Sequence, residues 1–306
     1  MSGNNIDKNI PLVSVVITTY KRPVDILMRS VKSVLNQTYP NLEVIIVNDY
    51  PDKESAECIR AAIQQLNDKR VQYYVNAENK GACYSRNFGA DKANGEFLAF
   101  LDDDDTWDGN KLEMHISYFD DPDVALVYSG MKKLFRTGVK EVLPNVDDDK
   151  AYPRILLGNF IGGCSVPVIR TSAFLDVGKF DEAFQSSQDI DLWIRLLARY
   201  KVKSIKTAYT NYYYSKESIT RNIARQLQGF DLILEKYSDQ FDKLPDYRLN
   251  RIERECALCV EKGTKKMFDN YFEKYKNAGG RTIKIIPKLL KSLTKRIISG
   301  IGLRDI

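Results

Sequence analysis

Four consecutive acidic residues, Asp102 to Asp105, directly follow the apolar run at 97–101. Adjacent carboxylates repel one another unless a cation or a donor-rich ligand offsets their charge. Hard oxygen ligands with open positions suit Mg²⁺ or Mn²⁺, and such ions are usually shared with a diphosphate. The pattern therefore predicts a site for a divalent cation and a diphosphate, with a solvated acidic turn as the simpler alternative.

The segments that must position these acids alternate between strand and helix patterns. The expected strands are 13–18, 43–47, 71–75 and 97–101, and the expected helices between them are 24–36, 53–66 and 82–92. Strands separated by helices of ten or more residues indicate βαβ units and a mostly parallel sheet. Ligands bind outside the carboxyl ends of such strands, which is where the four acids lie.

The second half of the chain is more mixed. The pattern predicts a mobile loop at 144–163, a helix at 187–199 that Ser187 opens, and helices from residue 226 onward. Cys256 and Cys259 form a CxxC without a second pair, whereas structural zinc requires four ligands, so we expect two cysteines on one helix face. The only histidine, His115, falls in an expected surface helix, which argues against histidine-based metal chemistry and Ser-His-Asp catalysis.

Composition sets the broad class. The 306 residues are 43% hydrophobic, which is enough for one large or two modest cores. The sequence contains no run of eighteen apolar residues, the length that crossing a bilayer requires. The N-terminus does not have the pattern of a secretory signal, and the five scattered cysteines suggest a reducing, cytoplasmic setting. The net charge of +5 is concentrated in residues 281–306, so we expect no nucleic-acid partner for the main domain.

An ordered set of motifs resembles the family 2 inverting glycosyltransferases of the GT-A fold, of the bacterial surface polysaccharide type. The motifs are VVITTYKR at 15–22, NKGA at 79–82, SRNFG at 85–89, GEFLAFLDDDD at 95–105, VGKFDE at 177–182 and SQDIDLWIRL at 187–196. Each motif is weak alone, but their order and spacing over residues 11 to about 222 are highly specific. The resemblance implies an α/β GT-A catalytic domain at 1–222, with a mostly parallel Rossmann-like sheet, and a helical C-terminal extension at 223–306.

The resemblance also implies how the nucleotide sugar is held. Thr19 and Asp49 match positions that hold the base, with Asp49 facing the uracil edge. Arg86 matches an arginine near the base and the phosphates. Asp102 is expected near the ribose, and Asp103 is also expected to contact the nucleotide sugar.

Metal binding and catalysis are assigned in the same way. Asp104 matches the residue that ligates a divalent ion, Mn²⁺ or Mg²⁺, bridging the diphosphate. Asp189 matches the catalytic acid of a Glu-Asp motif, in which Gln188 here replaces the usual glutamate. Asp191 is expected only to cap its helix, and Trp107 is the better of the two tryptophans for stacking on a sugar.

The implied reaction is metal-dependent inverting transfer from a UDP-sugar to the hydroxyl of a glycan or lipid-linked acceptor. Such a displacement requires a carboxylate to take the hydroxyl proton and a cation to stabilise the departing diphosphate. Asp189 is ionised at neutral pH if its pKa stays near the free value of about 3.9, although a helix N-terminus weakens it slightly as a base.

Two alternatives stay open. The atypical Gln188 is compatible with a nucleotide-sugar or metal-binding module that does not catalyse transfer. A nucleotidyltransferase would share the α/β layout but should carry a Gly-rich loop after the first strand, and the segment 18–22 contains no glycine.

The tail from residue 284 to 303 predicts a basic amphipathic helix. Such a helix suits an anionic membrane surface, so we expect a cytoplasmic enzyme that is peripheral on the inner face of the membrane. The alternative is a helix that docks on the main domain or on a partner chain.

Overall fold

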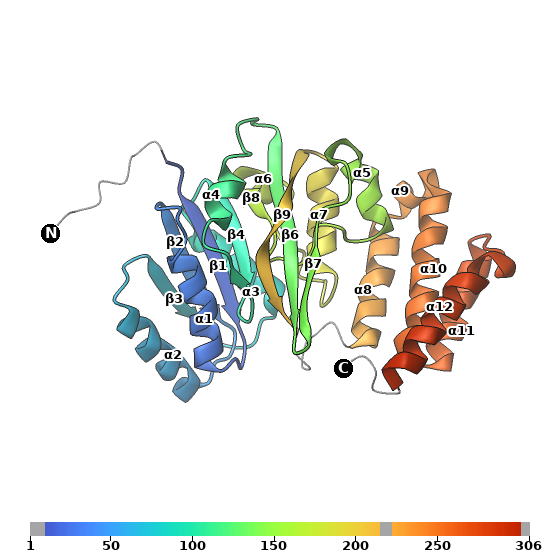
Figure 1. Ribbon diagram of the computed structural model, residues 1–306, viewed down its shortest axis with the longest axis horizontal. Coiled ribbons are helices and arrows are strands. Elements are labelled where there is room, and N and C mark those ends of the chain that lie inside the picture. Colours follow the sequence, from blue (N-terminus) through green and yellow to red (C-terminus); the bar gives the residue numbers. More distant parts are fainter. Residues whose placement is uncertain (1–9, 215–221, 301–306) are drawn as a thin grey trace. The chain divides into compact units, whose positions relative to one another are not determined.

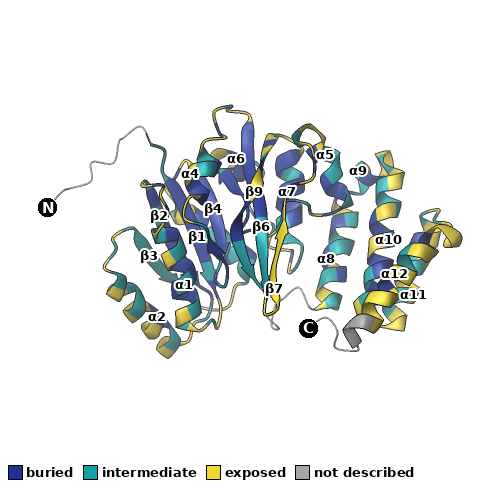
Figure 2. Cartoon of the chain, viewed as in Figure 1, coloured by how far each residue is buried: buried dark blue, intermediate teal, exposed yellow. Residues whose placement is uncertain are grey.

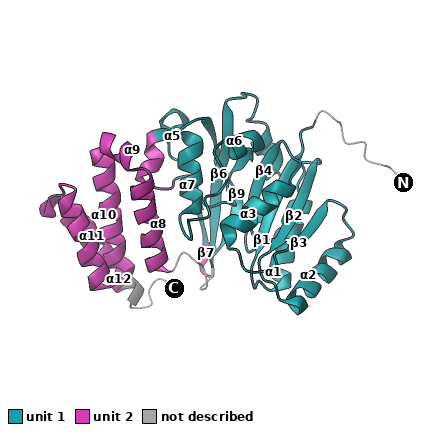
Figure 3. Ribbon diagram, turned by 180° about the vertical axis from the view of Figure 1, so that it is seen from behind, with its two compact units in different colours: residues 1–135, 139–152, 160–214 teal, residues 136–138, 153–159, 215–306 magenta. Residues whose placement is uncertain are grey.

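The structure is a computed structural model that describes residues 10–214 and 222–300. The chain divides into two compact units (Figure 3). The sheet unit comprises residues 1–135, 139–152 and 160–214, and the helical unit comprises 136–138, 153–159 and 215–306. The predicted boundary between residues 222 and 223 stays a prediction, because residues 215–221 lie outside the described ranges.

Within the described ranges, the sheet unit contains one nine-stranded sheet in the order β3-β2-β1-β4-β8-β6-β9-β5, with β7 paired to β6 (Figure 1). The strands are β1 (Val13–Thr19), β2 (Leu42–Asn48), β3 (Val71–Val75), β4 (Phe97–Asp102), β5 (Thr106–Trp107), β6 (Val124–Phe135), β7 (Gly138–Val142), β8 (Val168–Arg170) and β9 (Lys201–Tyr213). The first four strands are parallel, as are β6 and β9, whereas β8 and β5 are antiparallel to their neighbours. The predicted α/β class is confirmed, with antiparallel pairs in the second half of the sheet.

Helices follow the strands as the sequence pattern predicts. They are α1 (Val24–Leu35), α2 (Lys53–Leu66), α3 (Ala82–Lys92), α4 (Lys111–Ile116), α5 (Ala151–Arg154), α6 (Thr171–Asp176) and α7 (Gln188–Leu197). The segment 144–163, which we expected to be a loop, contains α5 and two short 3-10 turns, η1 (Asp148–Lys150) and η2 (Ile155–Leu157).

Both faces of the central strands are buried (Figure 2). Alternate residues of β1, such as Val15 and Ile17, join a core with α1 and α2, since side chains alternate across a strand. Val16 points to the other face, where α3 approaches so closely that a Cβ on Gly89 would lie 2.4 Å from a Val16 methyl. Glycine at this position lets α3 lie directly against the sheet. Arg86, one helical turn earlier, is thereby carried on a fixed helix.

The helical unit has its own core. Its helices are α8 (Ile223–Lys236), α9 (Ser238–Lys243), α10 (Pro245–Lys262), α11 (Lys265–Asn277) and α12 (Thr282–Gly300). Cys256 and Cys259 lie on the buried face of α10 as free thiols in that core. No described helix has both the length and the apolar composition that crossing a bilayer requires.

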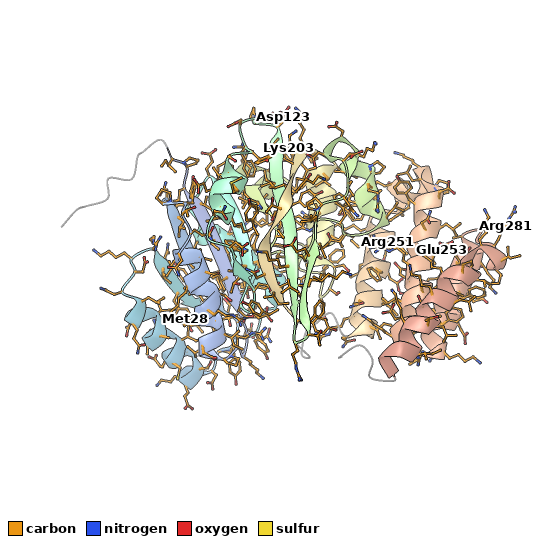
Figure 4. The ribbon with its side chains drawn as sticks, in the orientation of Figure 1. Met28, Asp123, Lys203, Arg251, Glu253 and Arg281 are labelled. Carbon is orange, nitrogen blue, oxygen red and sulfur yellow. The ribbon has the colours of Figure 1, made fainter. Side chains whose placement is uncertain are left out.

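A buried ion pair on α10 is incompletely satisfied. Arg251, labelled in Figure 4, and Glu255 are 2% and 1% exposed, and their nearest charged atoms are 3.7 Å apart. Arg251 donates to the Leu156 carbonyl at 3.0 Å, but its Nε and Nη2 and both Glu255 carboxylate oxygens lack hydrogen-bond partners. Burial raises the pKa of Glu255 to about 8, and the charge of Arg251 opposes that rise.

This pair predicts a pH-dependent stability. Between the ordinary glutamate pKa of 4.5 and about 8, folded Glu255 keeps a proton that the unfolded chain releases. Stability should therefore fall as the pH rises through this window, on the order of 1.4 kcal/mol per unit of pKa difference. Glu255→Gln should flatten the dependence in urea unfolding followed by far-UV circular dichroism.

Glu273→Gln, on the exposed surface of α11, is the matched control and should keep the wild-type dependence. Because Trp107 and Trp193 both belong to the sheet unit, tryptophan fluorescence follows that unit separately. The test compares the free energy of unfolding of the wild type with that of Glu255→Gln at each pH. If this difference stays constant or rises between pH 5 and 8, the raised pKa of Glu255 is contradicted.

Candidate active site

The carboxyl ends of β2, β1 and β4 meet at one edge of the sheet. Thr19 pairs with Asn48 across β1 and β2, and the neighbouring Thr18 pairs with Asp102 of β4. Asp49 follows β2 directly, and its N–H donates to the Thr19 carbonyl at 2.8 Å. Three residues that the sequence singled out, Thr19, Asp49 and Asp102, therefore lie side by side where open α/β sheets bind ligands.

The acid turn, defined as Asp102–Asp105, is held by positive charge from the segment after β1. The Asp103 carboxylate accepts from the Thr19 hydroxyl at 2.7 Å and from Arg22 Nε at 2.8 Å. Arg22 Nη2 also donates to Asp104 Oδ2 at 2.9 Å. Thr19 and Asp103, both predicted to contact the nucleotide sugar, are thus bound to each other, and Arg22 joins Asp103 to Asp104.

The backbone of the acid turn is held as well. Ser30 on α1 donates to the Asp103 carbonyl at 2.9 Å. Arg29 Nη2 donates to the Asp104 carbonyl at 2.6 Å, and the Arg29 guanidinium lies 3.7 Å from the centre of the Tyr213 ring. Donors from α1 therefore fix the turn independently of its side chains.

These contacts do not fully offset the negative charge. Burial and the neighbouring Asp102 raise the pKa of Asp104 to about 6, against the opposing charge of Arg22. Burial and the same neighbour raise the pKa of Asp105 as well, and one of its buried oxygens has no hydrogen-bond partner. An added cation would relieve both effects, so the acid turn fits a divalent ion.

The chain itself supplies few ligands to such an ion. Across residues 10–214 and 222–300, no three His, Cys, Asp or Glu side chains converge as a metal cluster. Mg²⁺ is commonly held by one or two carboxylates, with substrate phosphates and water completing the shell. The donor set at Asp104 fits that mode of binding and not a cage made only of protein ligands.

Asp49 organises the loop before α3. Its Oδ1 accepts from Asn76 Nδ2 at 2.8 Å and from the Lys80 N–H at 2.9 Å. Its Oδ2 accepts from the Gly81 N–H at 2.8 Å. Asp49 is 5% exposed, so a large part of its hydrogen-bonding capacity serves the loop that leads into α3. Its predicted contact with the uracil edge stays a prediction.

Arg86 links the acid turn to a helix from the second half of the chain. Its Nη2 donates to Asp102 Oδ1 at 2.8 Å, and its Nη1 donates to Gln188 Oε1 at 2.6 Å. Gln188 is the first residue of α7 and immediately precedes Asp189. One guanidinium therefore brings together residues that are far apart in the sequence.

Asp189 shares this electrostatic environment. Burial is the largest influence on its carboxyl and raises its pKa, with a further rise from the charge of Asp102. A hydrogen bond from the Ile190 N–H and the charge of Arg86 oppose that rise. We had expected the helix N-terminus to favour the carboxylate, but burial outweighs it. A raised pKa makes Asp189 a stronger base.

The backbone is strained at the start of α7. Ser187 has φ 63° and ψ 21°, a left-handed conformation that is unfavourable for a residue other than glycine, and its side chain makes no cap. Such strain is concentrated at functional sites, and here it immediately precedes Gln188 and Asp189. Asp191, expected only to cap the helix, is instead fully buried and paired with Arg195 at 2.6 Å.

The structure also corrects two expectations. Trp107 is 4% exposed and its Nε1 donates to the Ser165 carbonyl, so it offers no open face to a sugar. His115, expected on the surface, is fully buried. Sequence reasoning missed Arg22 and Arg29, although Arg22 ends the VVITTYKR motif and its position was the available signal.

Comparison with known proteins identifies the family. The family model described as glycosyl transferase family 2 matches residues 14–168. The chain is 29% identical over 247 residues to an Escherichia coli protein, covering 79% of this chain and 89% of that one. That relative is named UDP-Glc:alpha-D-GlcNAc-diphosphoundecaprenol beta-1,3-glucosyltransferase WfgD. A 31% identical uncharacterized glycosyltransferase of Rickettsia bellii is longer, and the match covers 64% of this chain and 28% of that protein.

Solved structures share the fold. Staphylococcus aureus TarS 1–349 in complex with UDP-GlcNAc superposes with a TM-score of 0.68 at 16% identity, covering 95% of this chain and 92% of that one. A Pyrobaculum calidifontis mannosyltransferase, PcManGT, in complex with GDP-Man and Mn²⁺, gives 0.58 at 14% identity, covering 96% and 88%. The GT-A fold and the glycosyltransferase class are thereby confirmed. The chain belongs to glycosyl transferase family 2.

Proposed function

We propose that this chain transfers a sugar, with inversion, from a UDP-sugar to the hydroxyl of a glycan or lipid-linked acceptor. The observation that carries the proposal is the Arg86 bridge between Asp102 and Gln188. The bridge connects the end of β4, which is expected to hold the donor, to the start of α7. The first turn of α7 carries Asp189, the candidate base that the resemblance supplies. Transfer requires those two groups in one site.

Asp189 is the proposed general base. It takes the proton of the acceptor hydroxyl as that oxygen attacks the anomeric carbon. Burial raises its pKa, which makes the carboxylate a stronger base toward the hydroxyl proton. Arg86 orients the adjacent Gln188 and so helps to fix where α7 begins.

Asp104 is the proposed ligand for Mn²⁺ or Mg²⁺. A divalent ion at this position would supply positive charge to the departing diphosphate. The raised pKa of Asp104 and the unpartnered oxygen of Asp105 support this role. The Mn²⁺ that accompanies GDP-Man in the PcManGT complex supports it by analogy.

Two aromatic side chains lie beside the strand ends proposed to bind the base. Tyr20 and Tyr50 form an edge-to-face pair with centroids 5.6 Å apart. Lys21 lies 5.0 Å from the centre of the Tyr50 ring. UDP as the donor nucleotide is supported by the names of WfgD and of the TarS complex, whereas PcManGT carries GDP-Man.

Asp189→Asn tests the base. The change keeps the shape of the side chain and removes the proton acceptor, so transfer should fall by roughly 10²–10⁴. UDP binding by calorimetry should stay close to wild type, and Asp120→Asn on an exposed loop is the control. Near-normal turnover would place the base elsewhere. Wild-type protein that binds donor but releases no sugar with any acceptor would favour the binding-module alternative.

Removal of the metal tests Asp104. EDTA should abolish transfer, and Mn²⁺ or Mg²⁺ should restore it, because the leaving diphosphate then regains its counter-charge. Asp104→Ala should lose the part of the UDP affinity that depends on Mn²⁺ and keep the part measured in EDTA. Full turnover in EDTA would refute the metal assignment.

The C-terminal helix is the proposed contact with an anionic membrane, which would place the enzyme at the inner face beside a lipid-linked acceptor. One face of α12 packs into the core of the helical unit through Ile285 and Leu289. The α12 stripe is the set of exposed apolar residues at helical spacing on another face: Ile283, Ile286, Leu290, Leu293 and Ile297. Exposed Lys284 and Lys291 add positive charge, each contributing about 1 kcal/mol at an anionic surface.

Point substitutions test this contact better than deletion, because deletion would also remove core residues. Leu290→Gln with Leu293→Gln should abolish sedimentation with anionic liposomes, since the exposed apolar area is lost without a change in charge. Lys265→Gln with Lys266→Gln on exposed α11 positions is the control. Activity on a soluble acceptor should persist. Unchanged liposome binding would rule out the stripe as the membrane contact.

A further inference from the structure

Lys111, on the first turn of α4, is a fully buried lysine. Burial lowers its pKa well below the ordinary lysine value. Among the residues that the structure describes, no carboxylate lies within ion-pair distance of its ammonium group. Burying such a group costs several kcal/mol unless hydrogen bonds compensate, and methionine would fill the same volume without that cost. Packing alone therefore does not explain a lysine at this position.

The Lys111 ammonium is held by two neutral acceptors. It donates to the Val166 carbonyl at 2.5 Å and lies 3.2 Å from His115 Nε2. His115 Nδ1 lies 2.7 Å from the Lys111 carbonyl, which can only accept, so Nδ1 carries the proton. Nε2 is then free to accept from the ammonium. The buried histidine thereby orients Lys111 toward Val166.

Val166 belongs to a short segment, Gly162–Val166, which we call the shelf. Its carbonyl groups accept from buried donors on four different elements. Trp107 Nε1 of β5 donates to the Ser165 carbonyl at 2.8 Å, and Thr210 Oγ1 of β9 donates to the same atom at 3.1 Å. Trp193 Nε1 of α7 donates to the Gly162 carbonyl at 3.1 Å, and Lys111 of α4 holds Val166.

The shelf in turn holds the acid turn. The Ser165 hydroxyl accepts from the Asp102 N–H at 3.1 Å. The same hydroxyl hydrogen-bonds the Asp105 carboxylate. One side chain thus touches both ends of the acid turn, and Asp104 lies between them. A displacement of Ser165 would move the proposed metal ligand without breaking any contact of Asp104 itself.

We propose that Lys111 is a positioning residue that, through Val166 and Ser165, fixes the acid turn in the geometry that binds the diphosphate and its cation. This inference rests on the proposed function and adds a residue that no motif in the sequence indicated. The Lys111 amino group hydrogen-bonds Val166 and His115, neither of which is proposed to bind the donor or the cation. Lys111 acts by fixing the shelf through the Val166 carbonyl.

Lys111→Met tests the inference, because methionine keeps the length and volume and removes the donor. The Mn²⁺ concentration for half-maximal UDP binding, measured by calorimetry, should rise about 10–100-fold, the range for residues that orient metal ligands. The donor KM should rise with it. The melting temperature should stay the same or increase, since the desolvation cost of a buried amino group has been removed. A purely structural role would lower the melting temperature and leave the Mn²⁺ dependence unchanged.

A double-mutant cycle with Ser165→Ala locates the coupling. If Lys111 acts through the shelf, the two single changes should weaken Mn²⁺-dependent UDP binding in a non-additive way, whereas independent effects would add. Trp107→Phe removes a different shelf donor and should reproduce the binding defect, so the inference stays testable if Lys111→Met does not fold. Unchanged Mn²⁺ dependence in Lys111→Met would overturn it, and if that variant does not fold, unchanged Mn²⁺ dependence in Trp107→Phe would overturn it. Wild-type protein that shows no Mn²⁺-dependent UDP binding would instead count against the proposed function.

Discussion

Repulsion among the four carboxylates at the end of β4 is offset from three directions in the folded chain. Arg22 approaches from the segment after β1, Arg86 approaches from α3, and the side chains of Arg29 and Ser30 donate from α1 to backbone carbonyls of the acid turn. The compensation is incomplete, because the pKa of Asp104 stays raised. A cation at the proposed metal site would offset the negative charge that remains on the acid turn.

Arg86 connects the acid turn electrostatically to Asp189, the proposed base. Its two terminal guanidinium nitrogens donate to a carboxylate, Asp102, and to a neutral amide, Gln188. A glutamate at position 188 would place a second negative charge on the same arginine and beside Asp189. The glutamine leaves more of the positive charge of Arg86 available to Asp102 and Asp189, while its amide oxygen keeps the bond that fixes the start of α7. The departure from the family motif is thus compatible with an intact site.

The proposed site is held by many contacts on the side of the sheet, whereas its backbone is strained at the start of α7. Donors on several elements converge on the shelf, and Gly89 allows α3 to lie directly on Val16. Ser187 adopts a left-handed backbone just before Gln188 and the proposed base, Asp189. Strain of this kind persists only where surrounding contacts over-determine the conformation, and the Arg86–Gln188 bond is one such contact.

The sequence alone was sufficient to predict the α/β class, the parallel first half of the sheet and the location of the acids at a strand end. Those features follow from local periodicity and from the apolar run at 97–101, which depend on neighbours along the chain. The order and spacing of the motifs also indicated the family. The sequence did not predict the burial of Trp107, His115 and Lys111. Their segment is short and has no periodic pattern of apolar residues that would show which side chains face the interior.

Pairings between distant residues were decided only by the tertiary structure. Nothing in the sequence indicates that Arg86 hydrogen-bonds both Asp102 and Gln188. Nor does it indicate that the Ser165 hydroxyl reaches the acid turn. Asp189 matched a catalytic position by resemblance, but the direction of its pKa shift depended on burial, which local sequence does not specify. The physical reason is that charge compensation and desolvation are set by which groups become neighbours in space, whereas the sequence by itself determined only which groups were available and on which elements they would stand.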